Sequence, residues 1–583
     1  MQAPLLSRPA LFALFLAFTL VWAGGLGFRK LIGPDEGRYA EIAREMAVTG
    51  DWVTPRLNAI KYFEKPPLQY WATAVAFKAF GETEWTARLW AGLTGFLCVL
   101  LCYFTGRRLY GRDAGLLAAA VAASCPLLLF IGHLNTLDMG LAFFLQLAVS
   151  GFLFAQQKAE QEHSWMLLTW AALALAVLSK GLVALLLPGL SLVVYSLLTR
   201  DFSAWRRLHM ITGIPLFLLI AAPWFIAVSR ANPEFAHFFF IHEHVERFLN
   251  KSHGRYQPAW YFLPIFIIGS LPWTLAMIQA MAAAWRRNGA QPFQSSRFLL
   301  VWALAAFLFF SVSDSKLPSY ILPIFPALAL LTGHCLTQSG RRTMLVHGGL
   351  AMAVALGAAI LPRLLIDPKD IEAVHLASFG EWITAAAALL FIMTLPALLL
   401  AWRNKPRQSA LLLAAAAFIA GLVVLQGHEQ IGRYNSAQAI ASQIRPQLIP
   451  EQAFYSVRMY DQTLPFYLGR TLTLVDYRDE MGFGLDQEPG KYLPTTAAFR
   501  QRWLTDSDPL AVMSRETYDQ LIAQGLPMKI VAQDTRRTIV KKVVPPPAPR
   551  PKSGGDGCSA AKSAASMPLT GPVLGRPCDG ASP

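Results

Sequence analysis

Long apolar stretches recur along the first three-quarters of the chain, and short polar segments separate them. A membrane-spanning helix needs about 20 mostly apolar residues. Thirteen stretches approach that length, at 10–28, 86–106, 114–132, 139–155, 165–179, 182–199, 210–228, 259–283, 299–312, 319–336, 344–361, 382–402 and 410–426. The pattern predicts a polytopic α-helical membrane protein with about 13 transmembrane helices.

The long apolar stretches stop near residue 427. Short β-rich runs at 453–459, 471–475, 529–531 and 538–543, with a helical pattern at 515–524, predict a small α/β domain over 428–545. Beyond it the composition shifts to Pro, Gly, Ser and Ala, which predicts a disordered tail over 546–583. The transmembrane domain is expected over 1–427, with a long loop at 28–86.

The composition supports a membrane protein and excludes other classes. Hydrophobic residues make up 54% of the 583 residues and charged residues only 15%, whereas a soluble protein has about 25% charged residues. The mean hydropathy is +0.40. These values exclude a soluble globular enzyme, a collagen-like chain and a chain that is disordered throughout.

The distribution of basic residues predicts the orientation. The formal net charge is +15, which in a soluble protein would suggest nucleic-acid binding. Here basic residues gather in alternate connections, as the positive-inside rule expects of cytoplasmic loops. They are Arg107, Arg108 and Arg112, then Arg200, Arg206 and Arg207, then Arg286, Arg287 and Arg297, then Arg341 and Arg342, then Arg403, Lys405 and Arg407. We therefore expect no nucleic-acid partner, a cytoplasmic N-terminus, and an external location for loop 28–86 and for everything after residue 427.

The long external loop carries two polar motifs. Asp35 and Glu36 directly follow the first predicted span, and apolar residues continue at helical spacing to Met46, which predicts an amphipathic helix on the membrane surface. Further along, Glu64 and Lys65 precede two prolines that break the chain direction. The alternative is that these charges are solvated loop residues at a membrane boundary.

Charged residues also occur where external loops meet predicted spans. Asp138 begins an apolar stretch, either as a helix N-cap or as a functional carboxylate. Lys180 separates two stretches, and its side chain is expected to extend to the external interface. Lys316 and Tyr320 lie in a third short external connection.

The external loop at 229–258 is rich in histidine and arginine. Arg247 and Arg255 are suited to bidentate phosphate binding, although a solvated basic loop beside lipid headgroups is an equal alternative. His242, Glu243 and His244 are too close in sequence to share one helix face, so their spacing is a weak indication of metal binding.

All these polar clusters fall on the predicted external side. Carboxylates and cations beside lipid suit a reaction in which a phosphate leaves and another nucleophile attacks, because the cations offset the charge of the leaving phosphate. An external site has no access to cytoplasmic nucleotide-sugars or ATP, so a lipid-linked donor is expected. No Walker A motif or dinucleotide fingerprint occurs there, and we expect no nucleotide cofactor.

The motifs resemble a known superfamily in their order and membrane positions. They are Asp35-Glu36-Gly37-Arg38-Tyr39, Glu64-Lys65-Pro66-Pro67, Asp138, Leu178-Ser179-Lys180-Gly181, Arg247 with His253-Gly254-Arg255, and Lys316-Leu317-Pro318-Ser319-Tyr320. Over roughly residues 9–540 the chain resembles the bacterial branch of the protein O-mannosyltransferase superfamily, whose members are glycosyltransferases with the GT-C fold. Within it, the chain is most similar to the lipid A 4-amino-4-deoxy-L-arabinose transferases.

This resemblance implies a reaction and a place for it. An inverting transferase would move 4-amino-4-deoxy-L-arabinose from undecaprenyl phosphate to a phosphate of lipid A, at the periplasmic face of the bacterial inner membrane and among membrane lipids. The modification would confer resistance to polymyxin and other cationic antimicrobial peptides. Related transferases that move another sugar to another glycan, lipid or protein share these motifs and remain an alternative.

The resemblance also implies roles for individual residues. Asp35 and Asp138 would be catalytic. The lipid phosphate would be held by Lys65, Arg247 and Tyr320, with Arg255 as the alternative to Arg247. Supporting roles would fall to Glu36, Glu64, Lys180 and Lys316. A divalent metal bound by Glu64 is a further expectation.

A transporter or flippase is the alternative from a different class. Transporters tend to place charged residues near the middle of the membrane, on paired broken helices. In this sequence the polar clusters lie at one face, and no internal repeat is present. The pattern therefore favours an enzyme.

Overall fold

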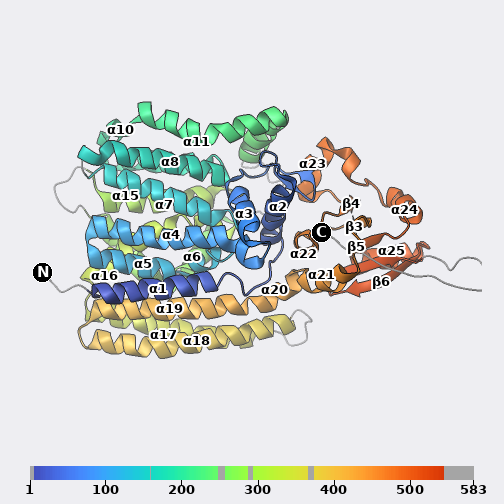
Figure 1. Cartoon of the computed structure of the whole chain (residues 1–583). Coiled ribbons are helices and arrows are strands. Elements are labelled where there is room, and N and C mark those ends of the chain that lie inside the picture. Colours follow the sequence, from blue (N-terminus) through green and yellow to red (C-terminus); the bar gives the residue numbers. More distant parts are fainter. Residues whose placement is uncertain (1–4, 158, 247–256, 287–292, 366–372, 544–583) are drawn as a thin grey trace, which may run out of the picture. The chain divides into compact units, whose positions relative to one another are not determined.

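The computed structural model describes residues 5–157, 159–246, 257–286, 293–365 and 373–543. The predicted tail at 546–583 lies outside this range, as do Arg247 and Arg255. A bundle of long helices makes up most of the described chain, and a sheet with several short helices follows in the sequence (Figure 1).

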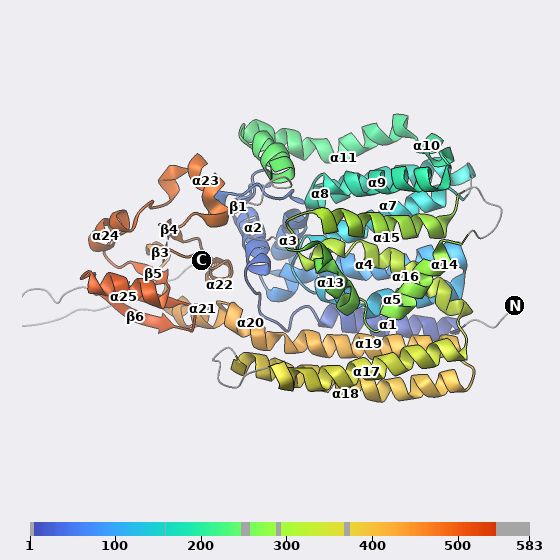
Figure 2. The ribbon, with the colours of Figure 1, turned by 180° about the vertical axis from the view of Figure 1, so that it is seen from behind.

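Every one of the thirteen predicted stretches is helical. The helices are α1 (Arg8–Gly24), α4 (Glu84–Tyr110), α5 (Arg112–Ser124) with α6 (Pro126–Ile131), α7 (Asp138–Ala155), α8 (Glu162–Lys180), α9 (Val183–Thr199), α11 (Met210–Ala231), α13 (Phe262–Gly269) with α14 (Thr274–Ala284), α15 (Ser295–Val312), α16 (Ile324–Gln338), α17 (Arg341–Leu365), α18 (Ala373–Trp402) and α19 (Pro406–Gly427). Figures 1 and 2 show them running side by side.

Proline explains two interruptions in these helices. Pro126 starts α6, and Pro272 lies in the break where α13 and α14 meet at 111°, because proline lacks the backbone N–H that a continuous helix requires. Within the described residues, seven helices are long and apolar enough to cross a membrane, or eight if the bent pair forms one span. Helices α1, α9 and α16 are apolar but shorter, so a total of thirteen spans stays a prediction.

The loop at 28–86 folds into α2 (Asp35–Thr49), strands β1 (Arg56–Leu57) and β2 (Ile60–Lys61), and α3 (Leu68–Phe80). The predicted helix at its start is present, and other parts of the protein cover it, while its place on the membrane surface stays a prediction. Residues 36–46 of α2 are all buried. The reason is that polar partners cover its charged side: Glu41 pairs with Arg44, and Glu45 accepts backbone hydrogen bonds of 2.5 Å and 2.7 Å from Asn58 and Ala59.

The C-terminal region contains the predicted α/β elements around one mixed sheet. Its strands are β3 (Phe454–Val457), β4 (Thr473–Val475), β5 (Leu510–Met513), β6 (Met528–Gln533) and β7 (Thr538–Lys542), in the order β4-β3-β5-β7-β6. Strand β3 is parallel to β4 and β5, whereas β7 is antiparallel to β5 and β6. The helices are α20 (Glu429–Asn435), α21 (Gln438–Ile444), α22 (Leu464–Leu468), α23 (Gly482–Gln487), α24 (Thr496–Thr505) and α25 (Arg515–Ala523).

The remaining elements are short. They are the helix α10 (Ser203–Arg206), the π-helix η2 (His237–Glu246), and the 3-10 turns η1 (Ala159–Gln161), η3 (Ala259–Tyr261), η4 (Pro318–Ile321), η5 (Arg445–Gln447), η6 (Asp479–Met481) and η7 (Pro489–Lys491).

Direct contacts join loop 28–86 to the C-terminal region. Asn58 exchanges two hydrogen bonds with the backbone of Leu472, of 2.6 Å and 2.7 Å, and Arg56 pairs with Glu488 at 3.0 Å. Residues of α2 and of the C-terminal region also share one apolar cluster, which includes Ile42 and Leu474. Helix α2 therefore contacts the rest of its own loop on one side and the C-terminal region on another. These contacts fix the position of Asp35 at its start.

Candidate functional site

Asp35 is the first residue of α2, and its side chain is 39% exposed. Its carboxylate accepts a hydrogen bond of 3.2 Å from Arg38, one helical turn later. Arg38 also forms an ion pair with Glu480, in η6 of the C-terminal region. This arrangement needs Gly37, because a Cβ atom there would lie 2.6 Å from the backbone oxygen of Gln462.

Glu36, the neighbour of Asp35, points into the protein and meets a different partner. Its carboxylate forms two hydrogen bonds with the Arg88 guanidinium, of 2.6 Å and 2.8 Å, and accepts the backbone N–H of Asn135 at 2.9 Å. Burial, the largest single influence, raises the pKa of Glu36, but the charge and hydrogen bonds of Arg88, the charge of Arg29 and the Asn135 N–H together outweigh it, and the pKa lies below its usual value. Glu36 thus stays ionised in the interior.

Asp138 and Lys180 meet although 42 residues separate them. Asp138 begins α7 and Lys180 ends α8, and the two side chains form an ion pair. The Lys180 ammonium also lies 4.5 Å from the centre of the Tyr320 ring, in η4. Asp138 makes no helix-capping hydrogen bond. The paired carboxylate and the aromatic ring cover the Lys180 side chain, which is 14% exposed, and its place relative to the external interface stays a prediction.

Lys65 lies just before Pro66 and Pro67, which lead into α3. Its ammonium donates to the backbone oxygen of Glu64 at 2.7 Å and to the Glu243 carboxylate at 3.2 Å, and the Glu64 carboxylate lies 3.9 Å away. Glu243 belongs to η2. Two acidic side chains therefore hold Lys65 in place from different segments.

Lys316 has a structural setting in the short connection before Tyr320. Its ammonium donates to the backbone oxygen of Gln257 at 2.7 Å and to that of Ser313. These bonds tie the connection that leads to Tyr320 to the segment that begins at residue 257.

The charges around Asp35, around Lys65 and in the Asp138–Lys180 pair act on one another over a distance. The charge of Asp35 acts on Lys180, and the charge of Glu64 acts on Tyr62 and Glu480. Burial raises the pKa of Glu480, and Arg38 offsets only part of this effect. The structure thus brings together Asp35, Lys65, Asp138, Lys180 and Tyr320 as the sequence predicted, and their roles stay predictions.

Several residues at this site were missed in the sequence analysis. Arg38 and Glu243 stood in recognised segments without an assigned role, whereas Glu480 gave no signal because it lies more than 400 residues beyond Asp35. Tyr62 and Tyr70 are buried, and their hydroxyl groups have no hydrogen-bond partner within the described residues. Unpaired buried hydroxyl groups are costly, so these two phenols stand out among the buried polar groups near Asp35.

A metal site does not form among the residues that the structure describes: no three His, Cys, Asp or Glu side chains converge there. Glu64 lies beside Lys65, a cation that competes for its carboxylate. The divalent metal expected at Glu64 stays a prediction.

Two known families match separate parts of the chain. Residues 9–239 match the family described as dolichyl-phosphate-mannose-protein mannosyltransferase. Residues 440–542 match the aminoarabinose transferase C-terminal domain. The first match contains Asp35, Lys65, Asp138 and Lys180, and the second contains Glu480.

Full-length relatives agree with both matches. An undecaprenyl phosphate-alpha-4-amino-4-deoxy-L-arabinose arabinosyl transferase of Erwinia tasmaniensis is 31% identical over 538 residues, which cover 89% of this chain and 95% of that protein. The crystal structure of ArnT from Cupriavidus metallidurans bound to undecaprenyl phosphate superimposes with a TM-score of 0.87 at 38% identity, covering 92% of this chain and 99% of that one. The apo structure of the same protein gives a TM-score of 0.85 at 39% identity, covering 92% and 98%. The chain therefore belongs to the undecaprenyl phosphate-alpha-4-amino-4-deoxy-L-arabinose arabinosyl transferases, a family of membrane glycosyltransferases with the GT-C fold.

Proposed function

We propose that this protein transfers 4-amino-4-deoxy-L-arabinose from undecaprenyl phosphate to a phosphate group of lipid A. One observation carries the proposal: a chain related over nearly its whole length to these transferases gathers Asp35, Lys65 and the Asp138–Lys180 pair at one site. The arginine-rich loops are expected in the cytoplasm, and the site lies on the loops of the opposite face. This favours a periplasmic location for the site, on the inner membrane.

In the reaction, a phosphate oxygen of lipid A forms a bond to the anomeric carbon of the sugar. The bond between that carbon and the undecaprenyl phosphate oxygen breaks, its electron pair stays on the leaving phosphate, and the anomeric configuration inverts. Lys65 and Tyr320, with Arg247 or Arg255, hold the undecaprenyl phosphate, and Lys65 offsets the negative charge that grows on it. Such stabilisation is strongest when the cation is already fixed in place, as the Glu64 and Glu243 contacts fix Lys65.

Asp35 does not act as a strong general base in this reaction. A phosphate of lipid A is already anionic near neutral pH, so the attacking oxygen hardly needs a proton removed. Asp35 instead orients the acceptor and stabilises positive charge that develops on the sugar carbon. Its partial exposure leaves one side of the carboxylate open to substrate, while Arg38 binds the other.

The test is mass spectrometry of lipid A from a bacterial strain that makes the donor lipid but lacks its own aminoarabinose transferase. Expression of this chain should add aminoarabinose to lipid A and raise polymyxin resistance, and Asp35→Asn should abolish both effects. Asp519→Asn is the matched control, since Asp519 is an exposed carboxylate on α25 that pairs with Arg515. Unmodified lipid A, with the protein in the membrane and the donor present, would redirect the proposal to another sugar or acceptor.

A further inference from the structure

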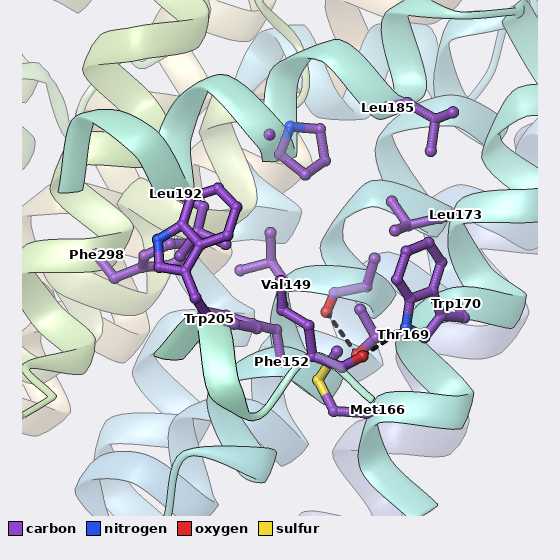
Figure 3. Close-up of a pocket in the computed structure, with 14 residues that line it drawn as sticks. Val149, Phe152, Met166, Thr169, Trp170, Leu173, Leu185, Leu192, Trp205 and Phe298 are labelled. Carbon is purple, nitrogen blue, oxygen red and sulfur yellow. Dashed lines mark hydrogen bonds between the residues drawn. The ribbon is translucent and has the colours of Figure 1, made fainter. Parts of the chain in front are cut away.

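An apolar cavity of about 190 Å³ lies between α7, α8 and α9 (Figure 3). The Thr169 hydroxyl and the Trp170 ring nitrogen beside it already donate to the backbones of Trp165 and Leu208, at 2.9 Å and 2.8 Å. Among the described residues that line the cavity, none is charged. The cavity therefore offers the reaction no charged group, whereas the C-terminal region brings charged side chains to the start of α2.

Two segments of the C-terminal region reach the first turn of α2. The η6 turn places Glu480 against Arg38, and the two side chains form an ion pair. Gln462, two residues before α22, lies so close to Gly37 that a Cβ atom there would be 2.6 Å from the Gln462 backbone oxygen. The Gln462 side-chain amide donates a hydrogen bond of 2.9 Å to the Glu480 carboxylate. Glu480 is therefore held by a cation of α2 and by an amide of its own region.

Arg38 is shared between two carboxylates. One of its terminal nitrogens, Nη1, donates to Asp35 at 3.2 Å, and the other, Nη2, pairs with Glu480. The side chains of Arg38 and Glu480 are 6% and 12% exposed, whereas that of Asp35 is 39% exposed. The more buried contact is therefore the one with Glu480, and Asp35 receives a single hydrogen bond from Arg38.

The partner of Nη2 decides how strongly Arg38 binds Asp35. A guanidinium and a carboxylate frequently join through two parallel hydrogen bonds. Such a bidentate pair would bind both oxygens of the Asp35 carboxylate and offset its charge. Because Glu480 occupies Nη2, Arg38 binds Asp35 through one nitrogen only, and the other side of that carboxylate stays open to substrate.

We propose that Glu480 is a positioning residue for the transfer reaction, because it draws the Arg38 guanidinium away from a bidentate contact with Asp35. Glu480 acts through Arg38 and keeps the Asp35 carboxylate available to the sugar carbon and the acceptor. Gln462 assists by fixing the Glu480 carboxylate. The inference rests on the proposed function, and it gives the C-terminal region a part in turnover.

The experiment measures kcat and KM with the full-length protein in vesicles that contain lipid A and the aminoarabinose donor lipid. Glu480→Gln removes the charge but keeps the shape, so Arg38 becomes free to close on Asp35. We expect kcat to fall about tenfold, equivalent to about 1.4 kcal/mol. The KM for the donor should stay close to that of wild type, because the groups that hold the donor phosphate are unchanged. Glu480→Asp keeps the charge and should recover part of the loss.

Arg38→Lys separates a positioning role from a structural one. A lysine ammonium lacks the planar fork of arginine and cannot form a bidentate pair with Asp35. In the Arg38→Lys background, Glu480→Gln should therefore lower kcat by a smaller factor than it does in wild type. The same factor in both backgrounds is expected of a purely structural ion pair, and that result would overturn the inference.

Glu488→Gln is the matched control. Glu488 also joins the C-terminal region to loop 28–86, through an ion pair of 3.0 Å with Arg56, and its side chain is 14% exposed. This ion pair does not involve Asp35 or its partner, so the control should keep a kcat close to that of wild type. An equal loss of kcat in Glu488→Gln and Glu480→Gln would overturn the inference, as would a wild-type kcat in Glu480→Gln.

If Glu480→Gln fails to accumulate in the membrane, Gln462→Met takes its place, since it removes the amide donor and leaves the ion pair. Its kcat should fall about threefold at an unchanged KM, and a wild-type kcat would overturn the inference. Failure of the wild-type protein to transfer aminoarabinose would overturn the proposed function and this inference with it. Transfer by wild type, with undiminished kcat in the variants, would overturn this inference alone.

Discussion

Asp35 and Glu36 are adjacent carboxylates on one helix, yet they belong to two different regions. We call the region of Glu36, Arg88 and Asn135 the buried anchor, and the region of Asp35, Lys65 and the Asp138–Lys180 pair the open site. In the buried anchor, fixed donors satisfy both oxygens of the Glu36 carboxylate. In the open site, Asp35 has one described partner and stays 39% exposed.

The difference assigns separate work to the two regions. A carboxylate whose oxygens are all bonded has no capacity left for a substrate, and the anchor therefore holds α2 against α4 and the start of α7. A partly exposed carboxylate beside cations keeps its field available to a reacting group. Stability is thus expected to depend on the anchor, and turnover on the open site.

Breaking the anchor should have the largest effect. Arg88→Met leaves the Glu36 charge buried without its partner, which costs about 3–5 kcal/mol, and the variant should unfold at a much lower temperature in detergent or fail to accumulate. Replacing both partners, with Glu36→Leu added, should recover much of the loss, because the buried Glu36 charge is removed with its partner and Glu429 still acts on the neighbouring Arg29. Equal thermal stability of Arg88→Met and wild type would contradict the role of the anchor.

Changing the open site should affect turnover instead. Asp35→Asn removes a charge that acts on the reacting centre, and kcat should fall about a hundredfold or more. The temperature of thermal unfolding should remain within a few degrees of wild type, since Asp35 is half-exposed and has one partner. Near-normal kcat, measured with purified protein and saturating donor, would remove Asp35 from the catalytic group.

Lys65 tests donor binding within the open site. A hydrogen bond to a charged group is worth about 1.5–3 kcal/mol, so Lys65→Ala should lower kcat/KM by about 10–100-fold. Lys65→Arg keeps the charge and should recover part of the activity. Lys78→Ala is the matched control, because the Lys78 ammonium bonds only weakly to the backbone of Ala47, at 3.4 Å. An equal loss in both alanine variants would show a general effect of removing positive charge.

The sequence predicted the regular parts of this structure well, for a physical reason. A bilayer requires apolar stretches of a given length, and all thirteen of them are helical. Strand β5 was missed because Leu510–Met513 is a run of four apolar residues, too short to distinguish a strand from a helix. The complete burial of α2 was not predicted, because residues that cover it come from a loop and from a distant domain, and local periodicity contains no information on either.

The same limit applies to the candidate site. Asp35, Lys65, Asp138 and Lys180 were found because they stand out against apolar neighbours at one predicted membrane face. Their ion pairs join segments that the sequence does not connect, such as Arg38 with Glu480 or Lys65 with Glu243. Arg88 was the one available signal for the buried anchor, since a charge near the start of an apolar stretch requires a partner.

The smallest effect is expected from Glu45, a second buried carboxylate on α2. Its pKa is shifted in the opposite direction to that of Glu36, which sharpens the comparison. Burial, and then the nearby Glu41 carboxylate, hold the pKa of Glu45 well above its usual value, despite the backbone N–H groups and Arg44. A raised pKa in the folded state gives stability that is full below the unfolded pKa of about 4.3 and is lost as pH rises through the folded pKa.

The free energy of unfolding of wild type should therefore fall as pH rises above about 4.3. Glu45 contributes at most about 1.4 kcal/mol per pH unit to this decrease. Glu45→Gln should flatten this slope, because the amide has no proton to lose. Glu36 contributes the reverse, since its lowered pKa gives stability that is lost as pH falls. An identical dependence of stability on pH in wild type and Glu45→Gln would mean that Glu45 is ionised in the folded protein, as Glu36 is. The pairing with Arg88 would then not explain a difference in pKa between Glu36 and Glu45.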